Sequence, residues 1–314
     1  MWWYAARRIA ASIPVLLLVT LISFSLMHLV PGDPAAAIAG AGATNQEIER
    51  IRVALGLDQP FLVQLGHWYG GLFRGDLGRS ILLNRPVWQA IVERLPITLP
   101  LALFALLLTL LVGIPAGVVA ALRANTWVDQ AVTGLALAGV SVPSFWLALM
   151  LIVLFGVHFE WLPTGGFVPF AEDPAAWARS MVLPSVSLAL LQIGLLARIT
   201  RSTMLEVLRQ DYVRTARAKG LPGWMVIGKH ALKNVMVPVV TVIGISFGLL
   251  LSGSIVIETV YGMPGIGRLI ANAIFGRDYP VIQGGLLLTG TMLVLLNLAV
   301  DLLYAAIDPR VRYG

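Results

Sequence analysis

Six long apolar stretches constrain this chain more than any other feature of its sequence. A helix needs about 20 mostly apolar residues to cross the hydrocarbon core of a bilayer. The predicted spans are residues 9–30, 97–122, 132–159, 182–199, 235–257 and 281–307. We therefore expect an all-α, polytopic membrane protein with six transmembrane helices.

The composition agrees with lipid as the main solvent of the chain. Only 12% of the residues are charged and 58% are hydrophobic, whereas a soluble domain carries about 25% charged residues. The absence of cysteine excludes disulfides and thiolate metal sites. The 4 histidines are scattered without ligand spacing, so we expect no metal site.

The positions of Lys and Arg predict the orientation of the spans. Most of the 22 basic residues fall near the N-terminus, in loops 123–130 and 198–234, and at the C-terminus. Basic loops remain in the cytoplasm, so both termini are expected to be cytoplasmic. The first span follows two arginines as in a signal peptide, but its length exceeds a typical signal core. We interpret residues 1–94 as an uncleaved anchor helix plus an exported segment, and residues 95–314 as the main transmembrane domain.

The exported segment, residues 31–94, contains two helix signals. Thr44 and Glu47 are spaced as a capping box. Farther along, Phe61, Trp68 and Tyr69 belong to an aromatic-rich amphipathic stretch. Such a stretch suits a helix at the membrane surface or one packed on the spans.

Two motifs resemble catalytic or binding signatures without their structural context. Residues 223–229 approach a phosphate-binding loop, but His230 stands where that loop needs Ser or Thr. If ATP is used, it is therefore expected to be hydrolysed elsewhere. Gly244 to Gly248 fits a hydrolase elbow, yet it lies inside an apolar span. With Gly113 and Gly117, it fits better as a small-residue contact between helices. We expect no catalytic residue.

Asp301 is the only carboxylate inside a predicted span. Intramembrane carboxylates are candidate functional groups, and a proton-coupled secondary transporter using Asp301 is one alternative. Pairing with an arginine near the inner end, such as Arg198 or Arg310, is the structural alternative and the one we favour. A third class, an intramembrane enzyme, would need a nucleophile and base that the sequence does not display.

The segment between the fourth and fifth spans, residues 198–234, is the most informative. A short helix is predicted over residues 212–219, ended by Gly220 and Pro222. Its basic fringe suits either a cleft on a soluble partner or anionic lipid, and the pattern alone does not choose.

Residues 211–220, followed by residues 230–238, resemble the signature loop of bacterial ABC importer permeases. Ala216 and Gly220 match the general pattern, whereas Arg214 and Thr215 stand where it has Glu and Ala. These departures are similar to the dipeptide, oligopeptide, nickel and glutathione branch. Other stretches resembling that branch are residues 29–34, 55–60, 75–78, 253–258, 264–267, 278–280 and 301–309.

The resemblance implies a permease subunit of an ATP-driven importer in the bacterial inner (plasma) membrane, with peptides as the leading cargo. Nickel chelates and glutathione stay open as cargo. The implied partners are a second permease, two cytoplasmic ATPases that carry ATP and magnesium, an exported substrate-binding protein and membrane lipid. No cofactor on this chain and no nucleic acid are implied.

The resemblance also assigns candidate residues. The expected ATPase-coupling residues are Asp211, Tyr212, Arg214, Thr215, Ala216, Arg217, Ala218, Lys219 and Gly220. Polar residues within the spans are the pore candidates: Ser141, Ser144, Ser185, Gln192, Ser246 and Ser252.

Overall fold

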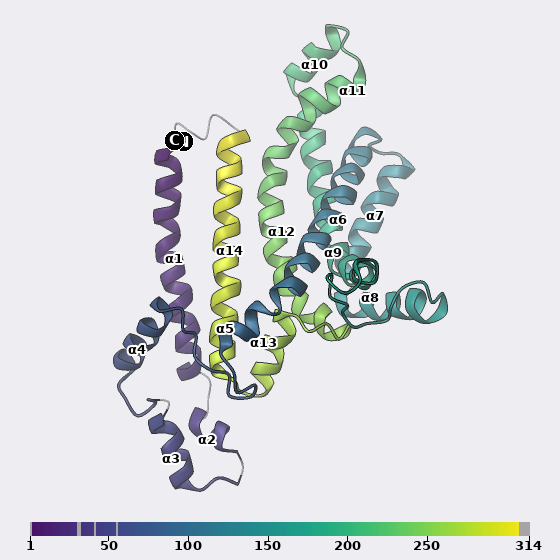
Figure 1. Ribbon diagram of the computed structural model, residues 1–314. Helices are drawn as coiled ribbons and strands as arrows, with labels where there is room; N and C mark the ends of the chain where they lie inside the picture. Colours follow the sequence, from purple (N-terminus) through teal and green to yellow (C-terminus); the bar gives the residue numbers. More distant parts are fainter. Residues whose placement is uncertain (1, 30–32, 41, 55, 308–314) are drawn as a thin grey trace.

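A computed structural model describes residues 2–29, 33–40, 42–54 and 56–307, and its regular elements are helices (Figure 1). Two π-helical segments, Ile152–His158 and Val226–Ala231, interrupt the α-helical series. The α-helices are α1 (Trp2–Leu29), α2 (Pro34–Ala39), α3 (Asn45–Ala54), α4 (Phe61–Phe73), α5 (Val87–Val92), α6 (Leu95–Leu122), α7 (Trp127–Ser141), α8 (Ser144–Leu151), α9 (Pro174–Leu208), α10 (Asp211–Ala218), α11 (Gly223–Met225), α12 (Leu232–Val260), α13 (Ile266–Phe275) and α14 (Tyr279–Ile307).

Within the described residues, 5 helical segments are long and apolar enough to cross a membrane, and a bent pair brings the number to 6. This confirms the predicted all-α polytopic class. The predicted third span, residues 132–159, is bent, because α7 and α8 meet at 104°. Pro143 causes the break: it has no N–H to donate, and it disfavours helical backbone at Val142, which is extended.

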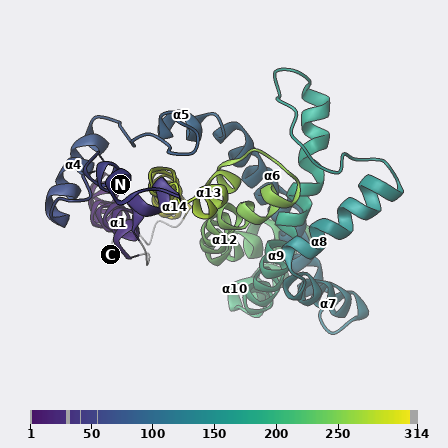
Figure 2. The ribbon, with the colours of Figure 1, turned by 90° about the horizontal axis from the view of Figure 1, so that it is seen from below.

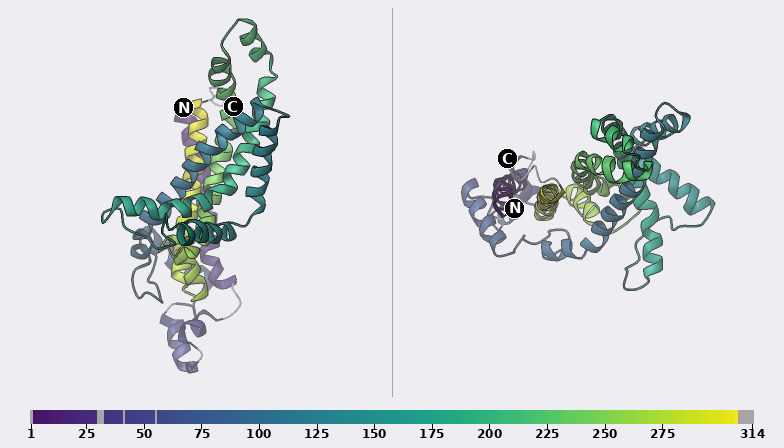
Figure 3. Two further views of the ribbon diagram at one scale, coloured as in Figure 1. Left: turned by 90° about the vertical axis from the view of Figure 1, so that its right-hand side faces the viewer. Right: turned by 90° about the horizontal axis from the view of Figure 1, so that it is seen from above.

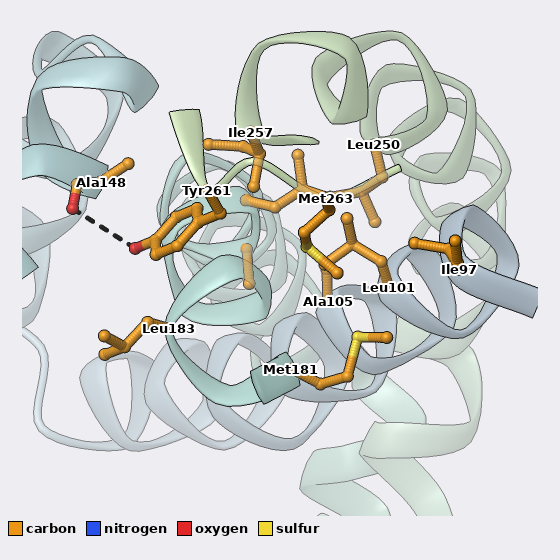
Figure 4. Close-up of a cluster of buried hydrophobic side chains, with 12 residues drawn as sticks. Ile97, Leu101, Ala105, Ala148, Met181, Leu183, Leu250, Ile257, Tyr261 and Met263 are labelled. Atoms are coloured by element: carbon orange, nitrogen blue, oxygen red, sulfur yellow. Dashed lines mark hydrogen bonds between the residues drawn. The ribbon is translucent and has the colours of Figure 1, made fainter. Parts of the chain in front are cut away.

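The α6–α9 pair makes the most extensive packing in the molecule, and α12 completes the core. Figure 4 shows one buried cluster in which Leu101 and Ala105 of α6 face Leu250 and Ile257 of α12. Within this cluster, the Tyr261 hydroxyl donates a hydrogen bond to the carbonyl of Ala148 in α8 at 3.3 Å. The core therefore joins helices from three distant parts of the chain.

Small residues allow the close approach of α6 and α9. A Cβ atom on Gly117 would lie 2.5 Å from the carbonyl oxygen of Ala197 and 2.6 Å from Cβ of Thr200. Gly113 similarly faces Leu196. The predicted role of this GxxxG pair in helix packing is confirmed.

The second GxxxG pair lets α12 and α14 approach closely. A Cβ on Gly244 would meet Val300 at 3.0 Å, and one on Gly248 would meet Leu293 at 2.7 Å. The elbow-like motif thus lies inside a helix, as expected, and has no strand before it in the described chain.

Helices α1 and α14 run side by side, apart from the α6–α7–α9 group (Figure 3). Helix α4 packs on α1: the hydroxyls of Thr20 and Tyr69 lie 2.7 Å apart, and the rings of Phe24 and Trp68 are separated by 5.6 Å. Of the two predicted placements of the aromatic stretch, packing on a span is therefore confirmed.

The capping box at the start of α3 is also confirmed. The backbone N–H of Thr44 donates to the Glu47 carboxylate at 2.8 Å, and the N–H of Glu47 donates to the Thr44 hydroxyl at 3.4 Å. The hydrogen bonds that the Glu47 carboxylate accepts from the N–H and the hydroxyl of Thr44 lower the pKa of Glu47.

Helix α9 is longer than its apolar stretch, residues 182–199, predicts. Helix α9 begins at Pro174 because the Asp173 carboxylate accepts hydrogen bonds from the N–H groups of Ala175 and Ala176, at 2.9 and 3.0 Å. Proline suits the first helical position. Helix α9 then continues to Leu208, so much of the predicted loop 198–234 is helical.

Candidate functional site

Helix α10 lies at one extremity of the molecule, and α2 and α3 lie at the other (Figure 1). The chain reaches α10 from the end of α9 and returns through Val226–Ala231 into α12. The predicted short helix over residues 212–219 is thus confirmed within one residue at each end.

One face of α10 is buried against the segments that flank it. Val213 is fully buried and Ala216 is 6% exposed. Both belong to a cluster with Val226, to which Leu208 and Leu221 contribute. Ala216 therefore seats α10 on the fold, and its side chain does not face outward.

The ends of α10 are held by local hydrogen bonds. Gly220 has a φ of +76°, where an L side chain is strained, and its N–H donates to the Arg217 carbonyl at 2.9 Å. The Tyr212 hydroxyl accepts a 2.8 Å hydrogen bond from the Asn234 side chain at the start of α12. This hydrogen bond connects α10 directly to α12.

The outward face of α10 is basic. Arg214, Arg217 and Lys219 are exposed, and Asp211 is the acidic residue among them. Asp211 and Arg214 form an exposed ion pair of 3.4 Å, which contributes little to stability. The other predicted residues of this set, Thr215, Ala218 and Gly220, are also exposed.

An ion pair fixes the end of α9 that leads into α10. Arg201 binds both carboxylate oxygens of Asp129 in α7, one at 2.6 Å, and Asp129 is 4% exposed. Bidentate pairing of this kind fixes geometry as well as charge. Sequence reasoning missed the pair because 72 positions separate its members and each belongs to a basic or polar inner segment.

The pore candidates do not form one group. Ser185, Gln192 and Ser246 are buried inside the helix bundle, each with a polar atom that lacks a hydrogen-bond partner in the described structure. Ser141 and Ser252 are exposed, and Ser144 is half-buried. Only the second set is accessible on the surface of the single subunit.

Glu258 is a second carboxylate inside a span, so the expectation that Asp301 is alone there is wrong. Helix α12 continues past residue 257 to Val260, and Glu258 is fully buried. Its carboxylate accepts hydrogen bonds from the Thr98 hydroxyl at 2.6 Å and from the N–H of Arg268 at 2.9 Å. Glu258 thus links α12 to α6 and to the first turn of α13.

Two glycines leave the space that Glu258 needs. A Cβ on Gly265 would overlap the Glu258 carboxylate, and one on Gly267 would lie 2.6 Å from Cα of Ile255. The motifs at residues 253–258 and 264–267 therefore form one structural unit. In the sequence only a short turn separates the two motifs, and this closeness was the one sign that they belong together.

Asp301 pairs with Arg8 of α1 at 2.8 Å. The expected kind of interaction, an ion pair, is confirmed, but the expected partner is wrong. Arg198 is not the partner, and Arg310 lies outside the described residues. The pair follows from the side-by-side packing of α1 and α14, which apolar patterning does not predict.

Among the described residues, no group of three His, Cys, Asp or Glu side chains is placed to hold a metal ion. Residues 223–229, which approach a phosphate-binding loop, are helical and follow a turn instead of a strand. The candidate site is therefore the exposed basic face of α10, supported by the Arg201–Asp129 ion pair and by packing beneath it.

Two family models match the chain. Residues 113–313 match "Binding-protein-dependent transport system inner membrane component", and residues 1–102 match the N-terminal part of such membrane components. A putative peptide transport system permease protein of Brucella abortus (strain 2308) is 55% identical over 98% of both chains. The dipeptide transport system permease protein DppB of Escherichia coli (strain K12) is 42% identical over 99% of this chain and 98% of its own.

The solved structures support the fold. The chain is similar to a chain in an inward-facing conformation of the MetNI methionine ABC transporter, with a TM-score of 0.59 and 18% sequence identity. The match covers 70% of this chain and 97% of the other.

Proposed function

Because the chain belongs to the family of binding-protein-dependent transport system inner membrane components, we propose that it is a pore-forming permease subunit of an ATP-driven peptide importer. The names of the relatives support peptides as cargo, ahead of nickel chelates and glutathione. The chain is a transport subunit, and ATP with magnesium binds to separate ATPase subunits.

The observation that carries the proposal is the construction of α10. Its inner face is anchored by Val213 and Ala216, while Arg214, Arg217 and Lys219 project outward at the extremity of the molecule. Because its inner face is buried, α10 can present its basic face to a groove on a soluble partner without unfolding. In the proposed complex, α10 faces the cytoplasm and contacts an ATPase.

Movement of α10 passes to the spans through direct connections. Tyr212 is bonded to α12 through Asn234, and α9 is fixed to α7 through Arg201 and Asp129. Closure of the ATPase pair would shift α10 and rock these helices as a unit, so that the pore opens alternately to each side.

The pore would form against a second permease subunit, with cargo delivered by a substrate-binding protein on the α3 side. Both termini of this chain and loop 198–234 would then be cytoplasmic, in a bacterial inner membrane. The exposed Ser141 and Ser252, with Ser144, are the pore-lining residues we propose first. Ser185, Gln192 and Ser246 are buried within the subunit and are proposed as contacts between helices.

Charge reversal on α10 tests the proposal. The full complex would be reconstituted in proteoliposomes with its ATPases and binding protein, and ATP-driven uptake of a labelled tripeptide measured. We expect Arg217→Glu with Lys219→Glu to reduce uptake about tenfold or more, because mismatched charges at an interface cost several kcal/mol.

The matched control is Arg277→Glu, which reverses an exposed charge between α13 and α14, away from α10. It should leave uptake within about twofold, as expected for a surface change. Equal losses in both variants, or transport by this chain without ATPases, would contradict the proposal.

A further inference from the structure

A pocket of about 230 Å³ lies beside α13, at the end of the molecule away from α10. Helix α13 is placed there between α14 and the α6–α12 pair (Figure 2). The polar lining comes from Arg94, at the α5–α6 junction, from Arg268 and Asn272 of α13, and from Asp278. The apolar wall includes Leu82, Leu83 and Leu269.

The two arginines have hydrogen-bonding capacity to spare. Arg94 donates to the carbonyl of Ala90 at 2.5 Å, and Arg268 donates to the carbonyl of Gly262 at 2.7 Å. A guanidinium group has five N–H donors. In the described part of the chain, neither arginine forms an ion pair.

The nearby carboxylates are already engaged. Asp278 is 1% exposed and accepts hydrogen bonds from the Ser80 hydroxyl at 2.5 Å and from the N–H of Leu82 at 3.1 Å. Glu93 pairs with Arg85 at 2.6 Å, and Glu258 is fully buried under α13. With two arginines and one hydrogen-bonded carboxylate, Asp278, in its lining, the pocket carries a net positive charge.

The arginines are also held in place before any ligand arrives. The backbone N–H of Arg268 is fixed by the Glu258 carboxylate at 2.9 Å, and Arg94 is bonded back onto α5. Groups that are ordered in advance lose less entropy on binding. This arrangement is typical of a recognition site more than of a solvated charged surface.

The chemistry and size of the pocket point to a carboxylate at the end of a small chain. The planar guanidinium fork matches a carboxylate. The volume is below the roughly 300–1,000 Å³ of pockets that enclose whole drug-sized ligands, so it suits one terminal residue. Leu83 and Leu269 offer apolar contact to its side chain.

We propose that this pocket binds the C-terminal carboxylate of a peptide before the peptide enters the pore. The inference rests on the proposed function, in which the α13 end faces the side from which cargo arrives. An acidic side chain of the docked binding protein is the competing occupant, and it would need no preference for a free peptide terminus.

The absence of cysteine from the sequence gives a direct test. Asn272→Cys introduces a unique thiol into the permease at the pocket. The permease–ATPase complex in proteoliposomes, without binding protein, is exposed to a tripeptide with a thiopyridine-activated central cysteine. The peptide carries either a free or an amidated C-terminus. We expect the free acid to label the thiol at position 272 about tenfold faster than the amide. The reason is that a hydrogen bond between a guanidinium and a carboxylate is stronger than one between neutral groups.

Adding Arg268→Gln should abolish this preference, whereas adding Arg277→Gln, outside the pocket, should preserve it. Equal labelling by the two peptides, or a preference that survives Arg268→Gln, would overturn the inference. If Asn272→Cys alone shows no terminus preference while Arg268→Gln weakens the affinity for the binding protein, the pocket belongs to the docked protein and the inference is also overturned.

The proposed function is tested separately in the same proteoliposomes. If the otherwise wild-type transporter takes up no peptide with ATP and binding protein, the proposed function fails. If it takes up peptide but Asn272→Cys labels without a terminus preference, only the pocket assignment fails.

Discussion

The carboxylate of Glu258 accepts a 2.6 Å hydrogen bond from the hydroxyl of Thr98, although 160 positions separate the two residues. The same hydroxyl oxygen accepts the N–H of Ile266 at 2.8 Å. Three helices, α6, α12 and α13, are therefore joined at one buried point.

Removing the Glu258 carboxylate should destabilise this junction. Glu258→Ala leaves the Thr98 hydroxyl and the N–H of Arg268 without their buried partner, at a cost of about 1–3 kcal/mol per unpaired group. Thermal unfolding of the purified complex in detergent should show a lower Tm, with Glu258→Gln affected less. An unchanged Tm for Glu258→Ala would show that the junction carries little stability.

The close contact at Gly117 predicts a strong effect of a small side chain. In Gly117→Val, the added atoms would press on the Ala197 carbonyl and on Thr200. Overpacking of this kind typically costs about 1–3 kcal/mol. Gly134→Val is the matched control, because a Cβ there meets no atom within 4 Å. The two variants should differ clearly in Tm, and similar values would argue against tight α6–α9 packing.

The Asp129–Arg201 pair predicts a loss that a charge swap partly restores. Arg201→Leu leaves a carboxylate that is 4% exposed without its guanidinium, and breaking buried pairs costs about 3–5 kcal/mol. The exposure of the Arg201 side chain, 28%, places the expected loss at the low end. The combined Asp129→Arg and Arg201→Asp variant should recover part of the lost Tm. If the Tm of the double variant is no higher than that of Arg201→Leu, a direct pair is refuted.

The Asp301–Arg8 pair predicts that Asp301 is dispensable for energy coupling. With side chains exposed by 28% and 46%, the pair should contribute at most about 1 kcal/mol. Asp301→Asn should therefore leave ATP-driven uptake within about twofold, and an uncoupler should not inhibit transport in proteoliposomes. Complete loss in this variant, together with uncoupler sensitivity, would favour a proton-driven transporter.

Glu47 predicts a local pH dependence in α3. Its pKa is lowered in the fold from 4.5 by the hydrogen bonds from Thr44. A lowered folded-state pKa stabilises the helix above the unfolded value, and this contribution is lost as the pH falls through the folded pKa. Amide hydrogen exchange in α3, corrected for intrinsic rates, should be faster at pH 3 than at pH 7. Thr44→Ala should remove most of that difference, and an equal response in both proteins would contradict the capping role.

Hydropathy predicted which segments are apolar, since lipid imposes that requirement on every span. It did not predict where the helices end. Helix α9 begins at an Asp173 cap and α12 runs on through Glu258, because a helix continues wherever its hydrogen bonds are satisfied. The 104° break at Pro143 depends on one residue in an otherwise uniform apolar stretch.

The local part of the candidate site was accessible from the sequence. The helix at residues 211–218, its glycine stop and its basic face are short-range features. The Arg201–Asp129 pair and the approach of Arg94 to Arg268 depend on contacts between distant segments. Such contacts depend on how the helices pack together, and no single stretch of the sequence predicts that packing.

The length of α12 has a mechanical consequence. Its 29 residues span about 43 Å at 1.5 Å per residue, whereas the hydrocarbon core is about 30 Å thick. A tilt of about 10° pivoting at the α13 end would swing the opposite end sideways by roughly 7 Å. A small rotation of α12 about its end near Glu258 is thereby amplified at its opposite end, where the chain leads to α10. The displacement there is as large as a whole side chain.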